Sequence, residues 1–280
     1  MTINQFGWKP SSLEKQASNA LYLFNRLGIA APAVVEKTFD WNADWLDEYD
    51  QGNIGSCVGY SCSWMMSYYN KKLYNAYRLY KQAQKDDGDG STTGDQDGAY
   101  LWSAGDVLRK RGHALYKTDT FIPAEGIINY YWCKSIDDIR TACDQGRPPV
   151  FGIPWFSEFN NPRTINGEFW IGERTNWGSI LGGHAIWDCA ISDSKTGAIS
   201  PAGAIALRNS WGRGWASGKP VWISYKSIQR LFSYGSECMV VMDIAPEPPP
   251  PPPDPEPEDT MTVTAIVDGK EYGGTLERVT

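Results

Sequence analysis

Residues 56–74, SCVGYSCSWMMSYYNKKLY, constrain the fold of this chain more than any other stretch. Apolar and aromatic residues lie on nearly every side of this segment over about four helical turns. A helix with such a pattern must be covered on all sides, so we expect a buried central helix. Gly55 and Ser56 supply a turn and an N-cap, which places Cys57 at the start of the helix.

The rest of the chain separates into a helical part and a strand-rich part. We expect helices at 13–27, at 99–112 and, with Ser135 as N-cap, at 135–146, whereas 38–50 is extended or irregular. From Val150 onwards strand-like segments dominate, namely VFGIPW, GEFWIG, GHAIWDCAI, GAIALRNSW, PVWISY and CMVVMDI. Helices followed by strands predict an α+β protein with separated layers.

The composition changes abruptly at Pro246. Residues 245–260, which include PEPPPPPPDPEPE, contain too little apolar surface to pack, so we expect a stiff polyproline II linker. Residues 261–280 alternate apolar side chains around Asp268-Gly269, which predicts a β-hairpin tail. A single hairpin does not form a stable domain, so we expect this tail to have a docking partner.

Charge and hydropathy argue against several classes of function. The formal net charge is −7, but the segment from Glu247 onwards has eight acidic and two basic residues, which leaves the body at −1. Nucleic-acid binding needs a clustered basic face, and a membrane span needs roughly 18 apolar residues in a row. The N-terminus lacks a basic start followed by an apolar run. We expect a soluble protein made without export, with no nucleic-acid or membrane partner.

Metal and disulfide chemistry are not expected. The cysteines show no C-x-x-C or zinc-type spacing, so we expect reduced thiols that mostly pack in the core. The polar loop at 86–98, DDGDGSTTGDQDG, lacks the spaced ligands and the closing Glu of an EF-hand. The six cysteines are Cys57, Cys62, Cys133, Cys143, Cys189 and Cys238.

A thiol, an imidazole and an amide are the candidates for chemistry. A helix N-terminus lowers the pKa of a thiol, which makes Cys57 a candidate nucleophile, with a buried structural cysteine as the alternative. His184, in ILGGHAIWDCAI, follows two glycines that let a backbone or substrate approach closely. The amide of Asn209 can fix the tautomer of an imidazole, beside Trp211. His113, in RKRGHALYK, is expected to be a solvated loop residue.

Three ordered motifs, Gln-Gly-x-x-Gly-Ser-Cys, Gly-His-Ala and Asn-Ser-Trp-Gly-x-Gly-Trp, resemble those of the papain-like (C1-type) cysteine peptidases. His184 follows Cys57 by 127 residues and Asn209 follows it by 152, near the family's usual separations. Residues 94–116 resemble the glycine-bearing wall of the family's substrate cleft and the helix after it. The resemblance covers residues 38–244.

The resemblance implies a two-lobed fold, with a helical left lobe whose central helix starts at the nucleophile and a β-barrel-like right lobe. It implies that Cys57 is the nucleophile, that His184 is its base and then the acid, and that Asn209 orients His184. The Gln51 side chain and the backbone N–H of Cys57 would donate to the oxyanion. An extended substrate peptide would lie along the remaining site residues, which are Gly55, Ser56, Gly98, Ala99, Gly183, Ala185, Trp211 and Trp215.

The chain also departs from the family. Residues 1–37 are too short for the usual long inhibitory propeptide, so we expect a structural arm or at most a partial plug of the cleft. Ile54 stands where the family has a disulfide-forming cysteine, and Val58 replaces an aromatic residue. Both departures favour a bacterial or phage-type member, located in the cytoplasm of a bacterium or infected host or associated with a virion.

The leading hypothesis is a cysteine endopeptidase that acts on a peptide or protein substrate without cofactor or metal. One alternative is a catalytically retired module with a structural or binding role, for example in a phage particle, because the linker and hairpin suggest tethering. Another is amide hydrolysis in a cell-wall peptide, or acyl transfer. A retired enzyme is free to lose a catalytic residue, whereas this chain keeps Gln51, Cys57, His184 and Asn209.

Overall fold

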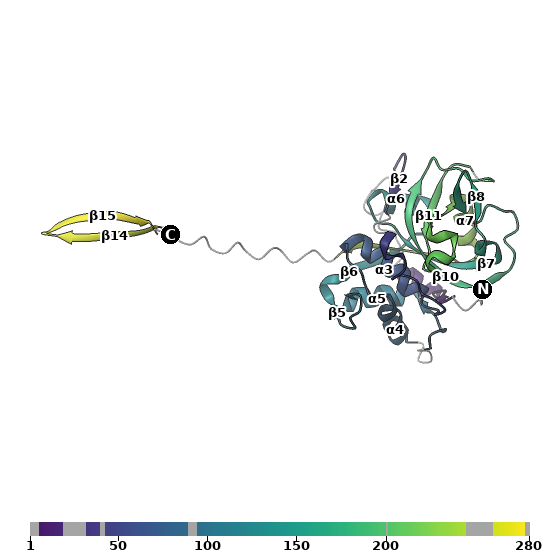
Figure 1. Ribbon diagram of the computed structural model, residues 1–280, viewed down its shortest axis with the longest axis horizontal. Coiled ribbons are helices and arrows are strands. Elements are labelled where there is room, and N and C mark those ends of the chain that lie inside the picture. Colours follow the sequence, from purple (N-terminus) through teal and green to yellow (C-terminus); the bar gives the residue numbers. More distant parts are fainter. Residues whose placement is uncertain are drawn as a thin grey trace. The chain divides into compact units, whose positions relative to one another are not determined.

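The computed structural model of the chain describes residues 6–18, 32–39, 43–88, 94–199, 201–244 and 260–277. It divides into two units, Met1–Ala245 and Pro246–Thr280. The first unit contains helices and a large sheet, and the second contains two paired strands (Figure 1). Helices α3, α4 and α5 gather at one side of the first unit, whereas most strands lie at the other side together with α6 and α7, which confirms the α+β class.

Three helices pack together in the helical part: α3 (Cys57–Asn70), α4 (Ala76–Asp86) and α5 (Leu101–Arg111). The prediction of a buried central helix is confirmed, because ten of the first eleven residues of α3 are buried. Ser56 occupies the N-cap position without a side-chain capping bond. The end of α5 is confirmed at Gly112, whose φ of 77° is a conformation that glycine adopts without strain.

A nine-stranded sheet forms the other part of the first unit. Its pairs are antiparallel except for β12 with β9, and β2 (Glu36–Thr38) pairs with β10 beside the main order. All six strand segments expected after residue 150 lie in it. The main spatial order is β6 (Ile127–Trp132), β13 (Glu237–Ile244), β7 (Val150–Phe156), β10 (Ile180–Ser192), β11 (Ala204–Arg208), β12 (Val221–Ser224), β9 (Glu168–Trp170) and β8 (Arg163–Ile165).

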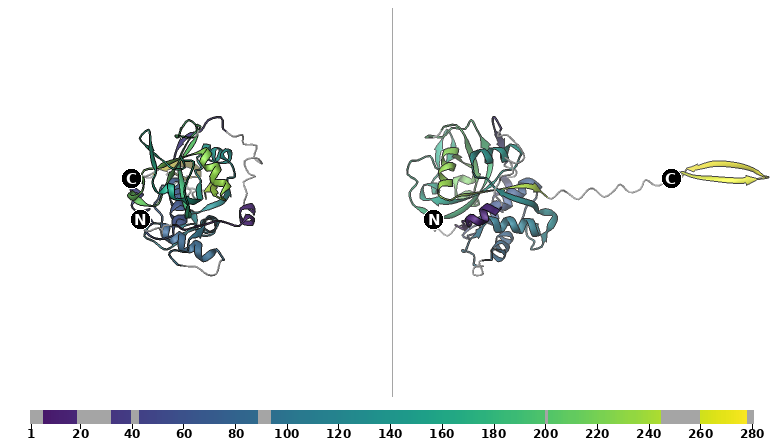
Figure 2. Two further views of the ribbon diagram at one scale, coloured as in Figure 1. Left: turned by 90° about the vertical axis from the view of Figure 1, so that its right-hand side faces the viewer. Right: turned by 180° about the vertical axis from the view of Figure 1, so that it is seen from behind.

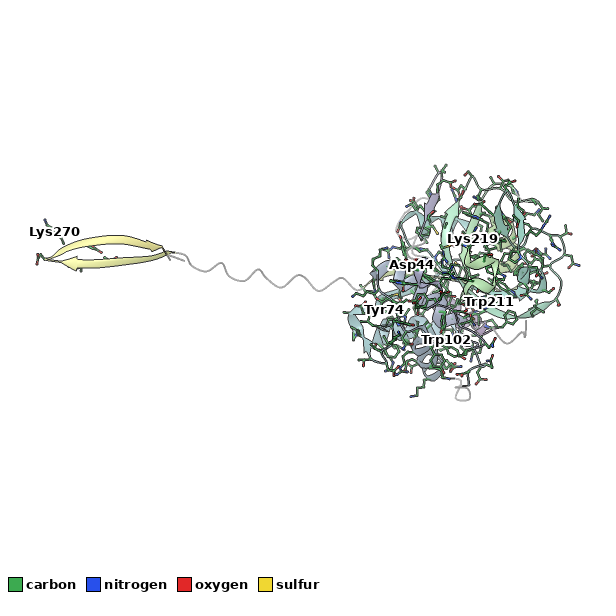
Figure 3. The ribbon with its side chains drawn as sticks, viewed as in Figure 1. Asp44, Tyr74, Trp102, Trp211, Lys219 and Lys270 are labelled. Atoms are coloured by element: carbon green, nitrogen blue, oxygen red, sulfur yellow. The ribbon has the colours of Figure 1, made fainter. Side chains whose placement is uncertain are left out.

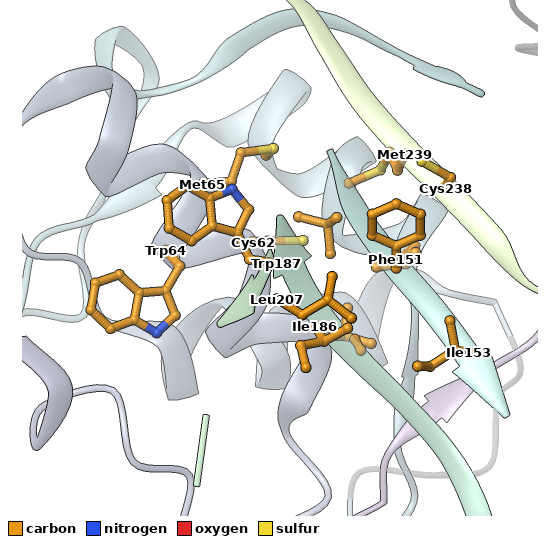
Figure 4. Packing of buried hydrophobic residues seen from close by; sticks show 14 of the residues in the cluster. Cys62, Trp64, Met65, Phe151, Ile153, Ile186, Trp187, Leu207, Cys238 and Met239 are labelled. Atoms are coloured by element: carbon orange, nitrogen blue, oxygen red, sulfur yellow. The ribbon is translucent and has the colours of Figure 1, made fainter. Parts of the chain in front are cut away.

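The core lies between α3 and the centre of the sheet. Cys62, Trp64 and Met65 of the helix belong to the same buried cluster as Ile186 and Trp187 of β10 (Figure 4). The indoles of Trp64 and Trp187 stack with ring centroids 6.1 Å apart. Large rings bury much apolar surface per residue, so this contact fixes α3 against the strand that carries His184.

Shorter elements complete the first unit. In α6, the Ser135 hydroxyl and the Asp138 carboxylate cap each other's backbone N–H groups, which confirms the expected N-cap. The helix expected at 13–27 is described only as α1, and its remainder lies outside the described residues. These elements are β1 (Trp8–Lys9), α1 (Leu13–Ser18), η1 (Ala43–Leu46), β3 (Ala99–Tyr100), β4 (His113–Ala114), β5 (Phe121–Ile122), η2 (Pro123–Glu125), α6 (Ile136–Asp144), η3 (Ser157–Asn160), η4 (Gly212–Gly214), η5 (Ala216–Gly218) and α7 (Tyr225–Ser233).

The second unit is the expected β-hairpin. Strand β14 (Thr260–Val267) pairs antiparallel with β15 (Lys270–Glu277), and Val267 lies opposite Lys270. Asp268 and Gly269 form the turn with φ values of 51° and 76°, as a two-residue hairpin turn requires. Figure 3 labels Lys270 next to this turn. The expected polyproline linker lies outside the described residues, apart from Thr260.

Candidate active site

The thiol of Cys57 lies at the first residue of α3 and is fully buried. The first N–H groups of a helix have no partner within the helix, and they favour negative charge at this position. The backbone N–H of Ala185 donates to Cys57 Sγ at 3.2 Å. The central helix and strand β10 therefore meet at this sulfur.

His184 lies on β10, Asn209 directly follows the neighbouring strand β11, and a hydrogen bond joins the two side chains. His184 Nε2 is 2.8 Å from Asn209 Oδ1, and the histidine is fully buried. Asn209 Oδ1 also accepts the backbone N–H of Ser210 at 2.7 Å, so the nitrogen of the imidazole must be the donor. The proton therefore sits on Nε2, and the other ring nitrogen, Nδ1, is left with its lone pair.

Aromatic rings enclose the imidazole. The rings of Trp211 and Trp155 have centroids 4.7 and 4.8 Å from that of His184. Trp211, labelled in Figure 3, was expected beside the histidine–amide bond, whereas Trp155 on β7 was not identified from the sequence. The continuous apolar run VFGIPW could have indicated that Trp155 is buried, but it could not indicate that Trp155 contacts a histidine on β10. Together the rings keep water from the hydrogen bond.

Gln51 is held rigidly beside the start of α3. Its Oε1 accepts from the Ser210 hydroxyl at 2.6 Å, and its Nε2 donates to the Ile54 carbonyl at 2.6 Å. Its backbone N–H also donates to the Ser210 carbonyl. Ser210 thus links Gln51 to Asn209, the preceding residue, and this positioning contact was not revealed by the sequence.

The chain's own N-terminal segment, residues 6–18, passes over the thiol. The backbone N–H of Gly7 donates to the Gly183 carbonyl at 2.9 Å, and the Gly7 carbonyl accepts from Ala99 at 2.7 Å. Beside it, β1 pairs in parallel with β3. Gly7 therefore bridges the helical wall and the sheet wall directly above Cys57. Figure 2 shows this segment, in purple, running between helices and sheet.

The side chains of Phe6 and Trp8 lie over two glycines that precede His184. A Cβ at Gly182 would lie 2.7 Å from the Phe6 side chain, and one at Gly183 would lie 2.2 Å from the Trp8 carbonyl. The Phe6 ring also packs edge-on to His184 with centroids 6.2 Å apart. The two glycines thus admit a chain close to the site, as predicted, and the chain that they admit is an internal one.

Burial favours the neutral forms of both Cys57 and His184. It raises the pKa of the Cys57 thiol to about 11, although N–H groups of Ala185 and Gly7 act in the opposite direction. It lowers the pKa of His184 to about 4, against the opposing hydrogen bond to Asn209. A charged thiolate–imidazolium pair is costly in so dry a place. In this closed arrangement the thiol carries its proton.

The other expected peptide-binding residues lie at various depths around Cys57. Ala99 and Gly183 bind the backbone of Gly7, whereas the carbonyl of Gly98 accepts from the Gln84 side chain. The Gly55 carbonyl contacts Gly7 so closely that a Cβ on Gly7 would lie 1.7 Å away. The remaining residues, Ser56, Ala185 and Trp215, are packed inside the domain. The indole Nε1 of Trp215 donates to the Phe159 carbonyl at 2.9 Å.

The prediction that His113 is solvated is wrong. The residue is fully buried, its Nε2 is 2.8 Å from the Ser63 hydroxyl, and its ring stacks on Tyr74 with centroids 4.4 Å apart. Its Nδ1 accepts the N–H of Ala114. The neighbouring basic residues face outward from the last turn of α5, so local charge misled the prediction. Burial lowers the pKa of His113 to about 3.

The part of the chain that the structure describes contains neither a metal-binding cluster nor a membrane-spanning helix. No group of three or more His, Cys, Asp or Glu side chains in that part of the chain is placed to hold a metal ion. None of its helices is long and apolar enough to cross a membrane. All six cysteines are buried thiols, as expected.

Solved structures of cysteine proteases share this architecture, although no family model and no curated protein matches the chain. Xylellain from Xylella fastidiosa is 20% identical with a TM-score of 0.63, over 86% of this chain and 96% of xylellain. Digestive procathepsin L 3 of the Tenebrio molitor larval midgut is 15% identical with a TM-score of 0.57, over 86% of this chain and 77% of that protein. Procathepsin B S9 from Trypanosoma congolense is 13% identical with a TM-score of 0.55, over 86% of this chain and 87% of that protein.

At these identities the likeness establishes the fold. The first unit has the two-lobed papain-like fold, with helices α3, α4 and α5 in one lobe and the sheet in the other. The fold expected from the three sequence motifs is therefore confirmed.

Proposed function

We propose that the chain is a cysteine peptidase that hydrolyses peptide bonds through a thioester acyl-enzyme. One observation carries this proposal: the His184–Asn209 hydrogen bond and the Ala185–Cys57 contact bring imidazole, amide and thiol to the start of α3. Each of these groups comes from a different segment, and packing alone does not require this combination of residue types. The fold shared with cysteine proteases supports the same activity.

In the proposed reaction, His184 Nδ1 takes the proton of the Cys57 thiol as the sulfur attacks the substrate carbonyl. Asn209 keeps the second nitrogen, Nε2, protonated and the ring in place. The resulting imidazolium gives its proton to the leaving amine, and the thioester remains. Water then attacks the thioester with His184 as base, which releases the acid and restores the thiol.

The oxyanion that forms in both steps would lie near the start of α3. The backbone N–H of Cys57 and the side-chain amide of Gln51 are its proposed donors. Ser210 and Ile54 already hold the Gln51 amide, so little reorganisation is needed when charge develops. Loss of one such donor typically lowers the rate on the order of 10²–10³-fold.

The peptidase is latent in the closed arrangement. Cys57 and His184 are both fully buried, and Gly7 occupies the space that a substrate peptide needs. The sequence led us to expect a structural arm or at most a partial plug, and we propose that residues 6–18 close the cleft, because they pair with both of its walls. The same burial favours a second reading, in which the fold is retired from catalysis and serves a binding role.

The test uses the full-length Phe6→Ala/Trp8→Ala variant, termed the opened variant, in which the segment loses the two side chains that anchor it over the site. We expect the opened variant to cleave a fluorogenic peptide library and to react with iodoacetamide at Cys57. Cleavage should disappear in Cys57→Ser and His184→Ala versions of the same variant. Circular dichroism and thermal melting of each variant confirm that it is folded.

The two readings differ in the outcome. If Cys57 in the opened variant labels no faster than Cys62 or Cys133, and no peptide is cut, the peptidase proposal is wrong and the retired module remains.

A further inference from the structure

A row of paired residues crosses four strands of the sheet, away from the candidate active site. Thr38 on β2 pairs with Ala190 on β10, Ala190 pairs with Ala206 on β11, and Ala206 pairs with Trp222 on β12. Residues paired in this way present their side chains to the same face of a sheet. The two alanines are too short to fill the distance from Thr38 to Trp222, which is three inter-strand spacings, about 14 Å.

A β-bulge widens the floor of the space above the two alanines. Asp188 lies opposite Leu207, but Ala190 lies opposite Ala206, so Cys189 is an extra residue in β10. At a bulge, two residues of one strand oppose a single residue of its neighbour. Cys189 and Ala190 therefore both line the floor beside Ala206, and the Cys189 thiol donates to the Ala206 carbonyl at 3.3 Å.

Aromatic side chains form walls of this space. Phe169 on β9 and Trp222 are both half-buried and line it. The Trp222 ring packs on the buried ring of Trp170, with centroids 6.1 Å apart, so this wall is fixed. We call the space between these rings and the floor of Cys189, Ala190 and Ala206 the alanine hollow. Its volume of about 360 Å³ lies within the range of roughly 300–1,000 Å³ that is usual for ligand pockets.

The rim of the alanine hollow carries one net positive charge among the described residues. Glu168 and Lys219 both line the rim. The Glu168 carboxylate is paired with Lys195 Nζ at 2.7 Å. In contrast, no ion pair joins the exposed Lys219, labelled in Figure 3, to another described residue. An anionic group on a ligand would complement this charge.

We propose that the alanine hollow binds a small aromatic carboxylate, whose ring lies on the two alanines and whose carboxylate pairs with Lys219. An aromatic ring suits this place because it covers the apolar floor and also makes edge-to-face contacts with the aromatic walls, which an alkyl chain does not make. The hollow shares no residue with the candidate active site, and Ala190 lies six residues, about 20 Å, along β10 from His184. Binding therefore requires neither an open cleft nor peptidase activity.

The experiment is isothermal titration calorimetry of the full-length wild-type chain with three probes: indole-3-acetate, indole-3-acetamide and octanoate. The first two have the same ring and differ in charge, so the ratio of their affinities reports the pairing of the carboxylate. We expect indole-3-acetate to bind about two- to fivefold more tightly than the amide, the usual effect of one exposed ion pair. Octanoate, which has the charge without the ring, should bind more weakly than indole-3-acetate.

Variants locate the binding. Lys219→Gln should bring the ratio for the two indole probes to about one while the affinity for the amide stays the same. Lys226→Gln is the matched control, because Lys226 is another exposed lysine of this unit and does not line the hollow. Ala206→Leu fills the floor and should weaken both indole probes on the order of tenfold. Phe169→Ala removes part of a wall and should also weaken both, which provides a second test if thermal melting shows that Ala206→Leu does not fold.

Each part of the proposal has an outcome that overturns it. Absence of indole-3-acetate binding refutes the site, as does binding that both Ala206→Leu and Phe169→Ala leave unchanged. Octanoate that binds as tightly as indole-3-acetate refutes the aromatic ligand class. If Lys226→Gln lowers the ratio as much as Lys219→Gln, the effect is one of overall charge and the role of Lys219 is wrong.

Discussion

Gly7→Ala is expected to open the active site. A Cβ at Gly7 would lie 1.7 Å from the Gly55 carbonyl oxygen, whereas ordinary contact begins near 3.4 Å. One of the two segments must therefore move by about 1.7 Å. A movement of this size breaks the hydrogen bonds of Gly7 to Gly183 and Ala99, which are 2.9 and 2.7 Å long.

The size of the effect follows from these contacts. Two backbone hydrogen bonds contribute about 1 kcal/mol each, and overpacking against a fixed backbone costs about 1–3 kcal/mol. Because the segment relieves the clash by leaving, we take about 3 kcal/mol as the loss of docking free energy. The population of the open form then rises roughly 100-fold.

The assay is the rate of Cys57 alkylation by iodoacetamide at neutral pH, followed by mass spectrometry of the Cys57 peptide. The rate should rise roughly 100-fold in Gly7→Ala, in proportion to the open population. Gly214→Ala is the matched control, since a Cβ there would meet nothing within 4 Å, and its rate should equal that of the wild type. A Gly7→Ala protein that is alkylated at the wild-type rate would show that this segment does not close the site.

Three further predictions concern the ionisable groups of the site and core. In the opened variant, Asn209→Ala should lower kcat about tenfold, because His184 loses the acceptor that orients it; an unchanged kcat in peptide hydrolysis would contradict this role. Alkylation of wild-type Cys57 should keep rising with pH toward its pKa of about 11, whereas in Gly7→Ala the pH profile should level off near the ordinary thiol value of about 8.5. Burial lowers the pKa of His113 to about 3, so the contribution of the neutral ring to the free energy of unfolding is complete above pH 6.5, the pKa of histidine in the unfolded chain. This contribution decreases by about 1.4 kcal/mol for each pH unit as the pH falls from 6.5 toward 3. Urea unfolding at pH 7 and pH 5 should show a smaller loss for His113→Gln than for the wild type, and equal losses would refute the assignment.

Local pattern was sufficient where the physical cause was local. The start of α3 at Cys57 follows from Gly55 and the apolar run after it, and the end of α5 follows from Gly112. The hairpin followed from Asp268-Gly269. The two histidines mark the limit of such reasoning. Both are fully buried, but basic neighbours made His113 look solvated, because the sequence does not show which way the side chains around a residue point.

The sequence by itself determined the residue types of the site and their order along the chain. It also determined the α+β class, since helical and strand periodicities are short-range properties. Only the tertiary structure decided what fills the cleft. Gly7 meets Gly183 and Ala99 through backbone hydrogen bonds, which any residue types can form and which leave no sequence pattern. Likewise, Glu237, Gly152 and Ala185 lie side by side only because three strands that are distant in the sequence pair in one register.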